Sequence, residues 1–242
     1  MVLGNVLITG GSGNLGKKFI SYFDDHNISY FAPTSREMDI TNLRSVWDYY
    51  QNRNINFLIH CAAFTDVKKA NVSDFFLECN RVNVVGTANI VEVACKNQCF
   101  LLYVSTDSVF DGKKGDYRPK DYTNPLTKYA RTKMAGEYLV MNYENSAIIR
   151  TSFFPQHFPY DSAFTDQITN KDYLDKIFEK ITYTINNIEI GKIYHVGTEK
   201  KTMYDLAVRT KKDVKKSRLK DFTLLNIAPD LSFNEEIKDE KY

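Results

Sequence analysis

Short apolar runs alternate, through residue 150, with segments in which apolar residues recur every three or four positions. The apolar runs predict strands at residues 5–9, 28–32, 55–60, 100–104 and 147–150. The periodic segments predict helices over residues 15–23, 41–50, 72–97 and 129–141. This alternation favours a parallel sheet with helices on both faces, because right-handed crossovers place the helices there.

Helix ends and breaks in the pattern add detail to this outline. Thr41 is the predicted N-cap of the helix that ends at Tyr50, and the helical periodicity over residues 72–97 is interrupted near Gly86. Beyond Thr151 the pattern loosens into aromatic, turn-rich segments. We therefore predict an α/β fold with a Rossmann-like, doubly wound parallel sheet. Residues 1–150 form its main domain, and residues 151–242 form a smaller portion interwoven with the sheet.

Three glycines follow the first predicted strand and lead into the first predicted helix. Gly10 suits a tight turn, Gly13 lets backbone N–H groups approach a pyrophosphate, and Gly16 lets the helix pack against the strand. The positive end of the helix would then face the anion. The motif predicts a dinucleotide site, although glycine turns of this kind also join a strand to a helix without any ligand.

The residues after the second predicted strand indicate which dinucleotide binds. An acidic residue at this point favours the free 2′-hydroxyl of NAD, whereas this chain has Thr34, Ser35 and Arg36. Two hydroxyls and a guanidinium suit a 2′-phosphate, so we expect NADPH, with NADH as the alternative. A solvated Arg36 without a ligand is the other interpretation.

Composition restricts the partners and the compartment. The chain has 242 residues, of which 43% are hydrophobic and 26% charged, with a formal charge of +2. So small a surplus favours neither nucleic acid nor a membrane surface as a partner. The four cysteines lack C-x-x-C spacing and the start of the chain lacks signal-peptide character, so we expect a cytoplasmic protein with reduced thiols. The four histidines are scattered, and no metal site is predicted.

Candidate chemistry lies after the fourth predicted strand and in the helix that follows. Thr106 is placed at the carboxyl end of the strand, where open α/β sheets bind ligands. Tyr129 and Lys133 are four residues apart and so share one helix face. A nearby ammonium should lower the pKa of the phenol from its usual value of about 10. Thr106 would then bind a substrate oxygen, Tyr129 would exchange its proton, and a nicotinamide would exchange hydride.

Each of these features also has an ordinary explanation. A tyrosine and a lysine four apart on a helix arise often by chance, Thr106 can cap a loop, and Asp107 can bind backbone N–H groups in an Asx turn. The combination of the glycine turn, the hydroxyl at the strand end and the Tyr–Lys pair is much less expected by chance.

The combination resembles the extended short-chain dehydrogenase/reductases, and within them the dTDP-4-dehydrorhamnose reductase type. The matching segments are Ile8–Gly16, Met38–Thr41, His60–Asp66, Val82–Thr87, Ser105–Gly112, Pro125–Lys133, Ile149–Thr151 and Tyr194–Gly197. The run that begins at Ser105 discriminates best among them. The resemblance implies an NAD(P)H-dependent reductase of a 4-keto-6-deoxy sugar attached to a nucleoside diphosphate, with residues 1–150 binding the coenzyme and residues 151–242 the substrate.

The resemblance also implies roles by position. Gly13, Asn14 and Leu15 would line the pyrophosphate, and Lys133 would hold the nicotinamide ribose as well as acting with Thr106 and Tyr129 in catalysis. The other implied coenzyme contacts are Asp39 and Ile40 on the adenine, and Ala62, Ala63 and Thr65 on the ribose side. Candidate substrate residues are Asp107, Thr151 and Gln167. Relatives of this type are often homodimers.

Departures from the family pattern leave the specificity open. Ser108 stands where the family usually has Tyr, and the segment between Thr151 and Lys171 is short, so the identity of sugar and nucleotide is not carried over. Residues 163–167 are the candidate segment that closes over the site, and residues 202–205 resemble a helix start that borders it. The basic run over residues 211–220 is either a diphosphate-binding segment or a solvated helix face.

Two other functions fit the same fold. An epimerase or dehydratase would keep and recycle a tightly bound NAD. A non-catalytic regulatory subunit would bind a partner protein through this fold. The presence of both Tyr129 and Lys133 argues against the regulatory subunit.

Overall fold

A computed structural model describes residues 4–222, 227–234 and 239–241. Within these residues a seven-stranded sheet has the order β13-β10-β5-β4-β3-β1-β2. Its strands are β1 (Val6–Thr9), β2 (Tyr30–Phe31), β3 (Phe57–His60), β4 (Phe100–Ser105), β5 (Ser146–Thr151), β10 (Lys192–Val196) and β13 (Asp239–Lys241). All neighbours pair in parallel except β10 and β13, which are antiparallel. The predicted α/β fold with a parallel sheet is confirmed, and the antiparallel edge strand adds to it.

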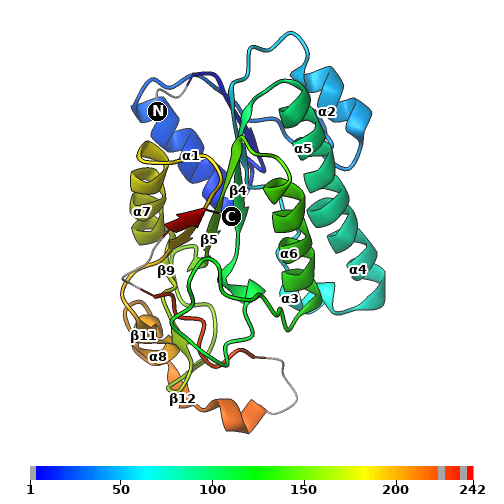
Figure 1. Cartoon of the computed structure of the whole chain (residues 1–242). Coiled ribbons are helices and arrows are strands. Elements are labelled where there is room, and N and C mark those ends of the chain that lie inside the picture. The colour runs from blue at the N-terminus through cyan, green and yellow to red at the C-terminus, as the bar shows by residue number, and fades with distance from the viewer. Residues whose placement is uncertain (1–3, 223–226, 235–238, 242) are drawn as a thin grey trace.

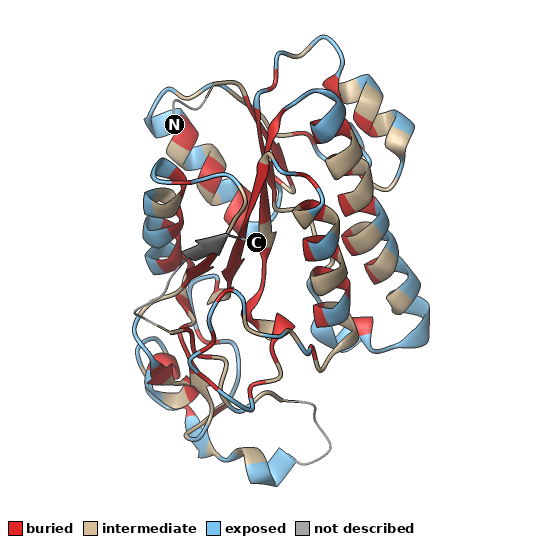
Figure 2. Ribbon diagram, in the orientation of Figure 1, coloured by how far each residue is buried: buried red, intermediate tan, exposed pale blue. Residues whose placement is uncertain are grey.

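Helices cover both faces of the sheet (Figure 1). One face carries α1 (Asn14–Asp25) and α7 (Leu174–Asn186), and the other carries α2 (Leu43–Tyr50), α4 (Ser73–Asn80), α5 (Thr87–Lys96) and α6 (Lys128–Met141). Successive strand residues point to opposite faces, so Val6 and Ile8 pack with α1 and α7 while Leu7 packs with the other layer. Figure 2 shows the result, with buried strands between helices whose outer faces are exposed.

Two local predictions about helices are wrong. Asn42, not Thr41, caps α2: its side-chain oxygen accepts from the N–H groups of Arg44 and Ser45, whereas the Thr41 N–H and hydroxyl both donate to Asp39. The helix is also not interrupted at Gly86. A π-helical stretch over Arg81–Gly86 joins α4 to α5 without a break, and Gly86 is small there because a Cβ would lie 2.7 Å from Ile40 Cδ1.

The chain after β5 builds a second lobe beyond the carboxyl ends of the strands and also returns to the sheet as α7, β10 and β13 (Figure 1). The lobe consists of α8 (Met203–Ala207) and short paired strands: β6 (Phe153–Phe154), β7 (Ser162–Phe164), β8 (Ile168–Thr169), β9 (Asp172–Tyr173), β11 (Lys201–Thr202) and β12 (Lys215–Ser217). The predicted helix start at residues 202–205 is confirmed, because Thr202 and Asp205 form a capping box. Between the sheet and this lobe lie α3 (Val67–Ala70) and a 3₁₀ turn at Asp107–Val109, and a second 3₁₀ turn covers Leu219–Phe222. None of the helices in the described part of the chain has the length and apolarity that a membrane crossing requires.

Candidate functional site

A cleft of about 710 Å³ opens at the carboxyl ends of β1, β3, β4 and β5. The strand order reverses between β1 and β3, which is where open α/β sheets bind their ligands. The predicted residues that line it are Gly10, Gly13, Asn14, Leu15, Asp39, Ile40, Ala62, Ala63, Thr65, Thr106, Tyr129, Lys133 and Thr151. Arg36, Asp107 and Gln167 are not among its lining residues. The structure therefore brings together nearly all of the predicted coenzyme residues and the three predicted catalytic residues.

The glycine turn at one end of the cleft is shaped for an anion. Gly10 has φ of +72°, and a Cβ there would lie 2.7 Å from the backbone nitrogen of Ala62. An added Cβ at Gly16 would clash with the carbonyl oxygen of Gly10. Gly13 precedes α1, and no side chain caps this helix. Because its uncapped first turn lines the cleft, the N–H groups there suit a pyrophosphate.

The loop after β2 only partly fits the prediction that the hydroxyls of Thr34 and Ser35 bind a 2′-phosphate. The backbone N–H and the hydroxyl of Thr34 both donate to the Glu37 carboxylate at 2.8 Å. Of the three predicted residues only Ser35 lines the cleft, and Arg36 is exposed. Sequence reasoning missed Glu37, although an acid three residues after a threonine is a recognisable turn-closing pattern. Glu37 is itself exposed and does not line the cleft, so its carboxylate closes the turn at Thr34.

Thr106, Tyr129 and Lys133 come together from β4 and α6. Thr127 caps α6 by accepting from the N–H of Ala130, which starts the helix so that Tyr129 and Lys133 lie one turn apart on the side facing the cleft. The Tyr129 phenol and the Thr106 hydroxyl both line the cleft, and Thr106 is a polar neighbour of the phenol. The Lys133 ammonium donates to the carbonyl oxygen of Val104 at 2.8 Å and lies 4.0 Å from the centroid of the Tyr103 ring.

The electrostatics of this group contradict one prediction. Burial raises the pKa of Tyr129 above its usual value, the Asp107 carboxylate raises it further, and the Thr106 hydroxyl offsets part of the increase. Burial also lowers the pKa of Lys133 to about 7, partly against the attraction of Glu137. The prediction that Lys133 lowers the pKa of Tyr129 is therefore wrong, because burial and the Asp107 charge set the direction of the shift. The phenol is neutral and is suited to donating a proton.

Asp107 is buried next to Thr106, one of the predicted catalytic residues, and three hydroxyl groups donate to its carboxylate. Its carboxylate accepts from Thr106 at 3.2 Å, from Ser108 at 3.1 Å and from Ser152. Thr106 also accepts from the N–H of Ser108, so the loop-capping role is confirmed alongside its position in the cleft. The Asp107 carboxylate therefore orients the hydroxyls of Thr106, Ser108 and Ser152. These contacts replace the suggested Asx turn, in which it would accept from backbone N–H groups. No sequence signal pointed to Ser152.

A second cavity of about 200 Å³ adjoins the cleft and shares Val67, Ser108 and Lys171 with it. Asp107 and Gln167 line this second cavity, and the Gln167 side-chain amide donates to the carbonyl oxygen of Ala228 at 3.1 Å. The three predicted substrate residues are thus divided, with Thr151 in the cleft and the other two in the adjoining cavity. Sequence reasoning missed Lys171, which borders both.

The family model described as RmlD substrate binding domain matches residues 4–172. The chain belongs to this family. A dTDP-4-dehydrorhamnose reductase from Aggregatibacter actinomycetemcomitans is 34% identical over 154 residues, which are 62% of this chain and 52% of that protein. A methionine adenosyltransferase 2 subunit beta from Xenopus laevis is 28% identical over 234 residues, 83% of this chain and 69% of that protein.

Solved structures extend the likeness of this RmlD-family chain beyond the matched segment. A dTDP-4-dehydrorhamnose reductase from Bacillus anthracis, crystallised in complex with NADP, superposes with a TM-score of 0.83 and 25% identity. That match covers 95% of this chain and 90% of the other. By sequence alignment, in contrast, the chain spans about half the length of the first curated relatives, at 52% and 49%.

A buried histidine, His60, ends β3 directly before Cys61, which lines the cleft of this RmlD-family chain. His60 Nδ1 lies 2.7 Å from the Thr9 hydroxyl, and Nε2 lies 3.1 Å from the Thr87 hydroxyl. Burial, with a smaller contribution from the Lys133 charge, lowers the pKa of His60 to about 3. The pKa of His195, on β10, is also well below its usual value because of burial and the neighbouring Arg150.

These two histidines predict a loss of stability in mild acid. In the unfolded chain each binds a proton below a pH of about 6.5, whereas in the native state both stay neutral, so the free energy of unfolding falls as the pH drops. The expected slope is up to about 1.4 kcal/mol per pH unit for each histidine. Urea unfolding at several pH values between 7.5 and 5 measures it. His60→Gln and His195→Gln should each flatten the slope, and His157→Gln, at an exposed position, should not. Equal slopes in all four proteins contradict the prediction.

Proposed function

We propose that the protein is an NAD(P)H-dependent oxidoreductase that reduces a 4-keto-6-deoxy sugar linked to a nucleoside diphosphate, as dTDP-4-dehydrorhamnose reductases do. The observation that carries this proposal is the meeting of Thr106, Tyr129 and Lys133 in one cleft with the uncapped start of α1. Membership of the RmlD family and the 34% identical reductase support it.

The residues of the cleft fit a nicotinamide dinucleotide. The turn at Gly10, Gly13, Asn14 and Leu15 would hold the pyrophosphate, and Lys133 the nicotinamide ribose. The adenine side would be held by Asp39 and Ile40, and the adjoining ribose side by Ala62, Ala63 and Thr65. When bound, the coenzyme supplies a hydride. We propose NADPH, supported by the NADP named for the Bacillus anthracis structure and by Arg36 as a partner for a 2′-phosphate. NADH is the alternative.

The chain's own residues would supply the proton and the charge stabilisation. Tyr129, held neutral by burial, donates its proton to the carbonyl oxygen as that oxygen gains negative charge. The Thr106 hydroxyl donates its single proton to the Asp107 carboxylate in the structure and would turn that proton to the same oxygen when substrate binds. The Ser108 N–H and the Ser152 hydroxyl hold the Thr106 oxygen in place. The Lys133 ammonium, buried on the same helix face, stabilises the phenolate that remains.

We further propose that residues 1–150 bind the coenzyme and that residues 151–242 complete the substrate side, with Thr151, Asp107 and Gln167 as substrate contacts. The cleft residues Phe153, Pro159 and Lys171 support this division. A cytoplasmic location is supported by four free cysteines. A homodimer is supported by Phe75 and Leu77, which α4 leaves exposed, and its mass in solution tests it.

The direct test is a turnover assay. The protein, NADPH and a dTDP-linked 4-keto-6-deoxy sugar should together consume the absorbance of the reduced nicotinamide, and NADH in place of NADPH should show which coenzyme is preferred. Tightly held NAD with no net redox turnover supports the epimerase or dehydratase instead. Coenzyme binding without any reaction on sugar nucleotides supports a regulatory subunit.

A further inference from the structure

We propose that the Lys171 ammonium binds the diphosphate of the substrate at the junction of the two cavities, and that the second cavity receives the nucleoside. This inference rests on the proposed function, because it assumes a substrate that carries a nucleoside diphosphate. It assigns a phosphate contact to a residue that the sequence motifs do not mark.

Lys171 occupies the point where the cleft and the second cavity meet. It lines both, together with Ser108 and Val67. Its ammonium lies 4.8 Å from the centroid of the Phe154 ring, and no carboxylate of the described residues lies within ion-pair distance of it. Since a half-buried cation in a polar-lined opening gains most from an anion, the junction is suited to a phosphate.

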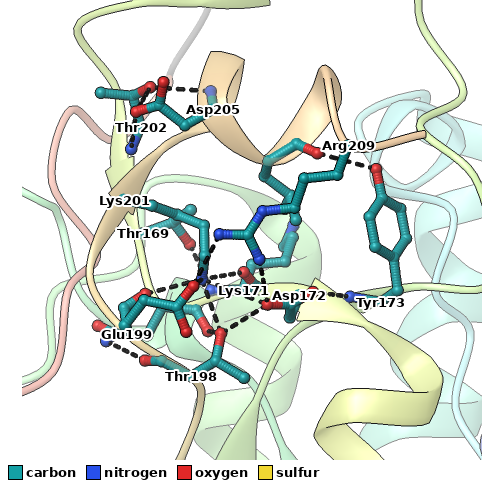
Figure 3. A network of polar contacts seen from close by, with 12 residues as sticks. Thr169, Lys171, Asp172, Tyr173, Thr198, Glu199, Lys201, Thr202, Asp205 and Arg209 are labelled. Atoms are coloured by element: carbon teal, nitrogen blue, oxygen red, sulfur yellow. Dashed lines mark hydrogen bonds and ion pairs between the residues drawn. The ribbon is translucent and has the colours of Figure 1, made fainter. Parts of the chain in front are cut away.

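Two other cations occupy the carboxylate next to Lys171, that of Asp172 (Figure 3). The adjacent Asp172 is buried, and its carboxylate accepts from the Thr198 hydroxyl at 2.8 Å and from Arg209 at 3.1 Å. Lys201 lies 3.5 Å from the same carboxylate. Asp172 is therefore neutralised by two other cations and is not a counter-ion for Lys171.

The same network holds the backbone of Lys171 in place. Lys201 Nζ donates to the Lys171 carbonyl oxygen at 3.1 Å, and the Lys171 N–H donates to the Thr169 hydroxyl at 2.9 Å. Figure 3 shows these groups converging on the start of β9. These bonds fix the backbone from which the Lys171 side chain reaches the junction.

The order of groups in the two cavities matches the order of groups in a nucleotide-linked sugar. The reacting carbonyl belongs beside Thr106 and Tyr129, in the cleft. The second cavity is lined mainly by apolar side chains, among them Phe110, Leu126, Ile168 and Met203, and also by the amide of Gln167. An apolar pocket with a few polar groups suits a nucleoside base. If the sugar lies in the cleft and the nucleoside in the second cavity, the diphosphate that joins them lies at the junction, beside Lys171.

The basic run over residues 211–220 does not take this role. None of its lysines or its arginine lines either cavity. Lys211 pairs with Asp161 at 2.7 Å and donates to the Tyr160 carbonyl oxygen, and Lys216 lies over the Tyr204 ring. Lys211 thus anchors a loop of the cleft wall, and the predicted diphosphate contact is better assigned to Lys171.

The test measures binding of nucleoside diphosphates without turnover, by calorimetry on the full chain. Lys171→Met should weaken the binding of dTDP or UDP ten- to a hundredfold, because a charge-assisted hydrogen bond to phosphate is lost. It should leave the binding of thymidine or uridine and of NADPH unchanged. Lys212→Met removes the same charge from an exposed position outside both cavities and should bind like the wild type. Equal melting temperatures for the two variants show that Lys171→Met folds.

Three results would overturn the inference: unchanged diphosphate affinity in Lys171→Met, an equal loss of NADPH affinity, or no binding of either diphosphate by the wild type. The turnover assay separates this inference from the proposed function. A weakened diphosphate affinity without reductase activity supports the phosphate site and refutes the reductase. Normal reductase activity with unchanged diphosphate affinity in Lys171→Met refutes only the phosphate site.

Discussion

Replacing Tyr129 by Phe should lower kcat by a factor of about 10² to 10⁴. The substitution removes only the hydroxyl, which lines the cleft near Thr106 and carries the proton that the proposed reduction delivers. The affinity for NADPH should change little, because the ring stays in the wall of the cleft. Steady-state rates with a 4-keto-6-deoxy sugar nucleotide, together with coenzyme titration, measure both quantities.

Tyr138→Phe is the matched control for this experiment. Tyr138 lies on the same helix, α6, but its side chain is 52% exposed and lies outside the cleft, so its hydroxyl should not affect the rate. A Tyr129→Phe enzyme that turns over as fast as Tyr138→Phe would exclude the phenol as the proton donor.

Replacing Arg150 by Met should lower the free energy of unfolding by about 3–5 kcal/mol. Arg150 Nη2 lies 2.7 Å from Glu137 Oε2, and both side chains are almost fully buried. The guanidinium also donates to the Pro119 carbonyl oxygen at 2.8 Å and lies 5.0 Å from the centroid of the Phe110 ring. Without it, the Glu137 carboxylate is left buried and unpaired, which is what makes the loss large.

Thermal unfolding measures this effect as a fall in Tm of roughly 6 to 20 °C. Arg44→Met breaks an exposed pair with Asp48 on α2 and should cost about 0.5 kcal/mol or less. The double variant Arg150→Met, Glu137→Met should recover much of the loss, since apolar side chains can replace a buried pair. A melting temperature for Arg150→Met close to that of Arg44→Met would show that the buried pair contributes little.

The parts of the fold and site that sequence predicts well are those specified by neighbours along the chain. Three glycines between an apolar run and a periodic segment define the turn before α1, and the four-residue spacing places Tyr129 and Lys133 on one face. These features depend on local geometry, so the pattern alone reaches them.

The parts that sequence does not predict arise from long-range contacts. Lys171 is unremarkable until the carboxylate beside it is neutralised by Lys201 and Arg209, which lie 29 to 37 positions further along the chain. Ser152 reaches Asp107 across two neighbouring strand ends. The pKa of Tyr129 depends on how deeply its surroundings exclude water, which residue spacing does not report.

The position of β10 bears on how this chain can be divided. β10 lies in sequence between the lobe strands β6 to β9 and the later lobe elements β11, α8 and β12. It nevertheless pairs with five residues of β5, and α7 covers the face of the sheet below them. A fragment that stopped at residue 150 would leave the edge of β5 that faces β10 unpaired, and the apolar side chains of Ala147 and Ile149 without their cover from α7. The boundary near residue 150 therefore does not separate two autonomous folding units. Exchanging the lobe between relatives, to alter the choice of sugar, would require keeping the host's own α7 and β10.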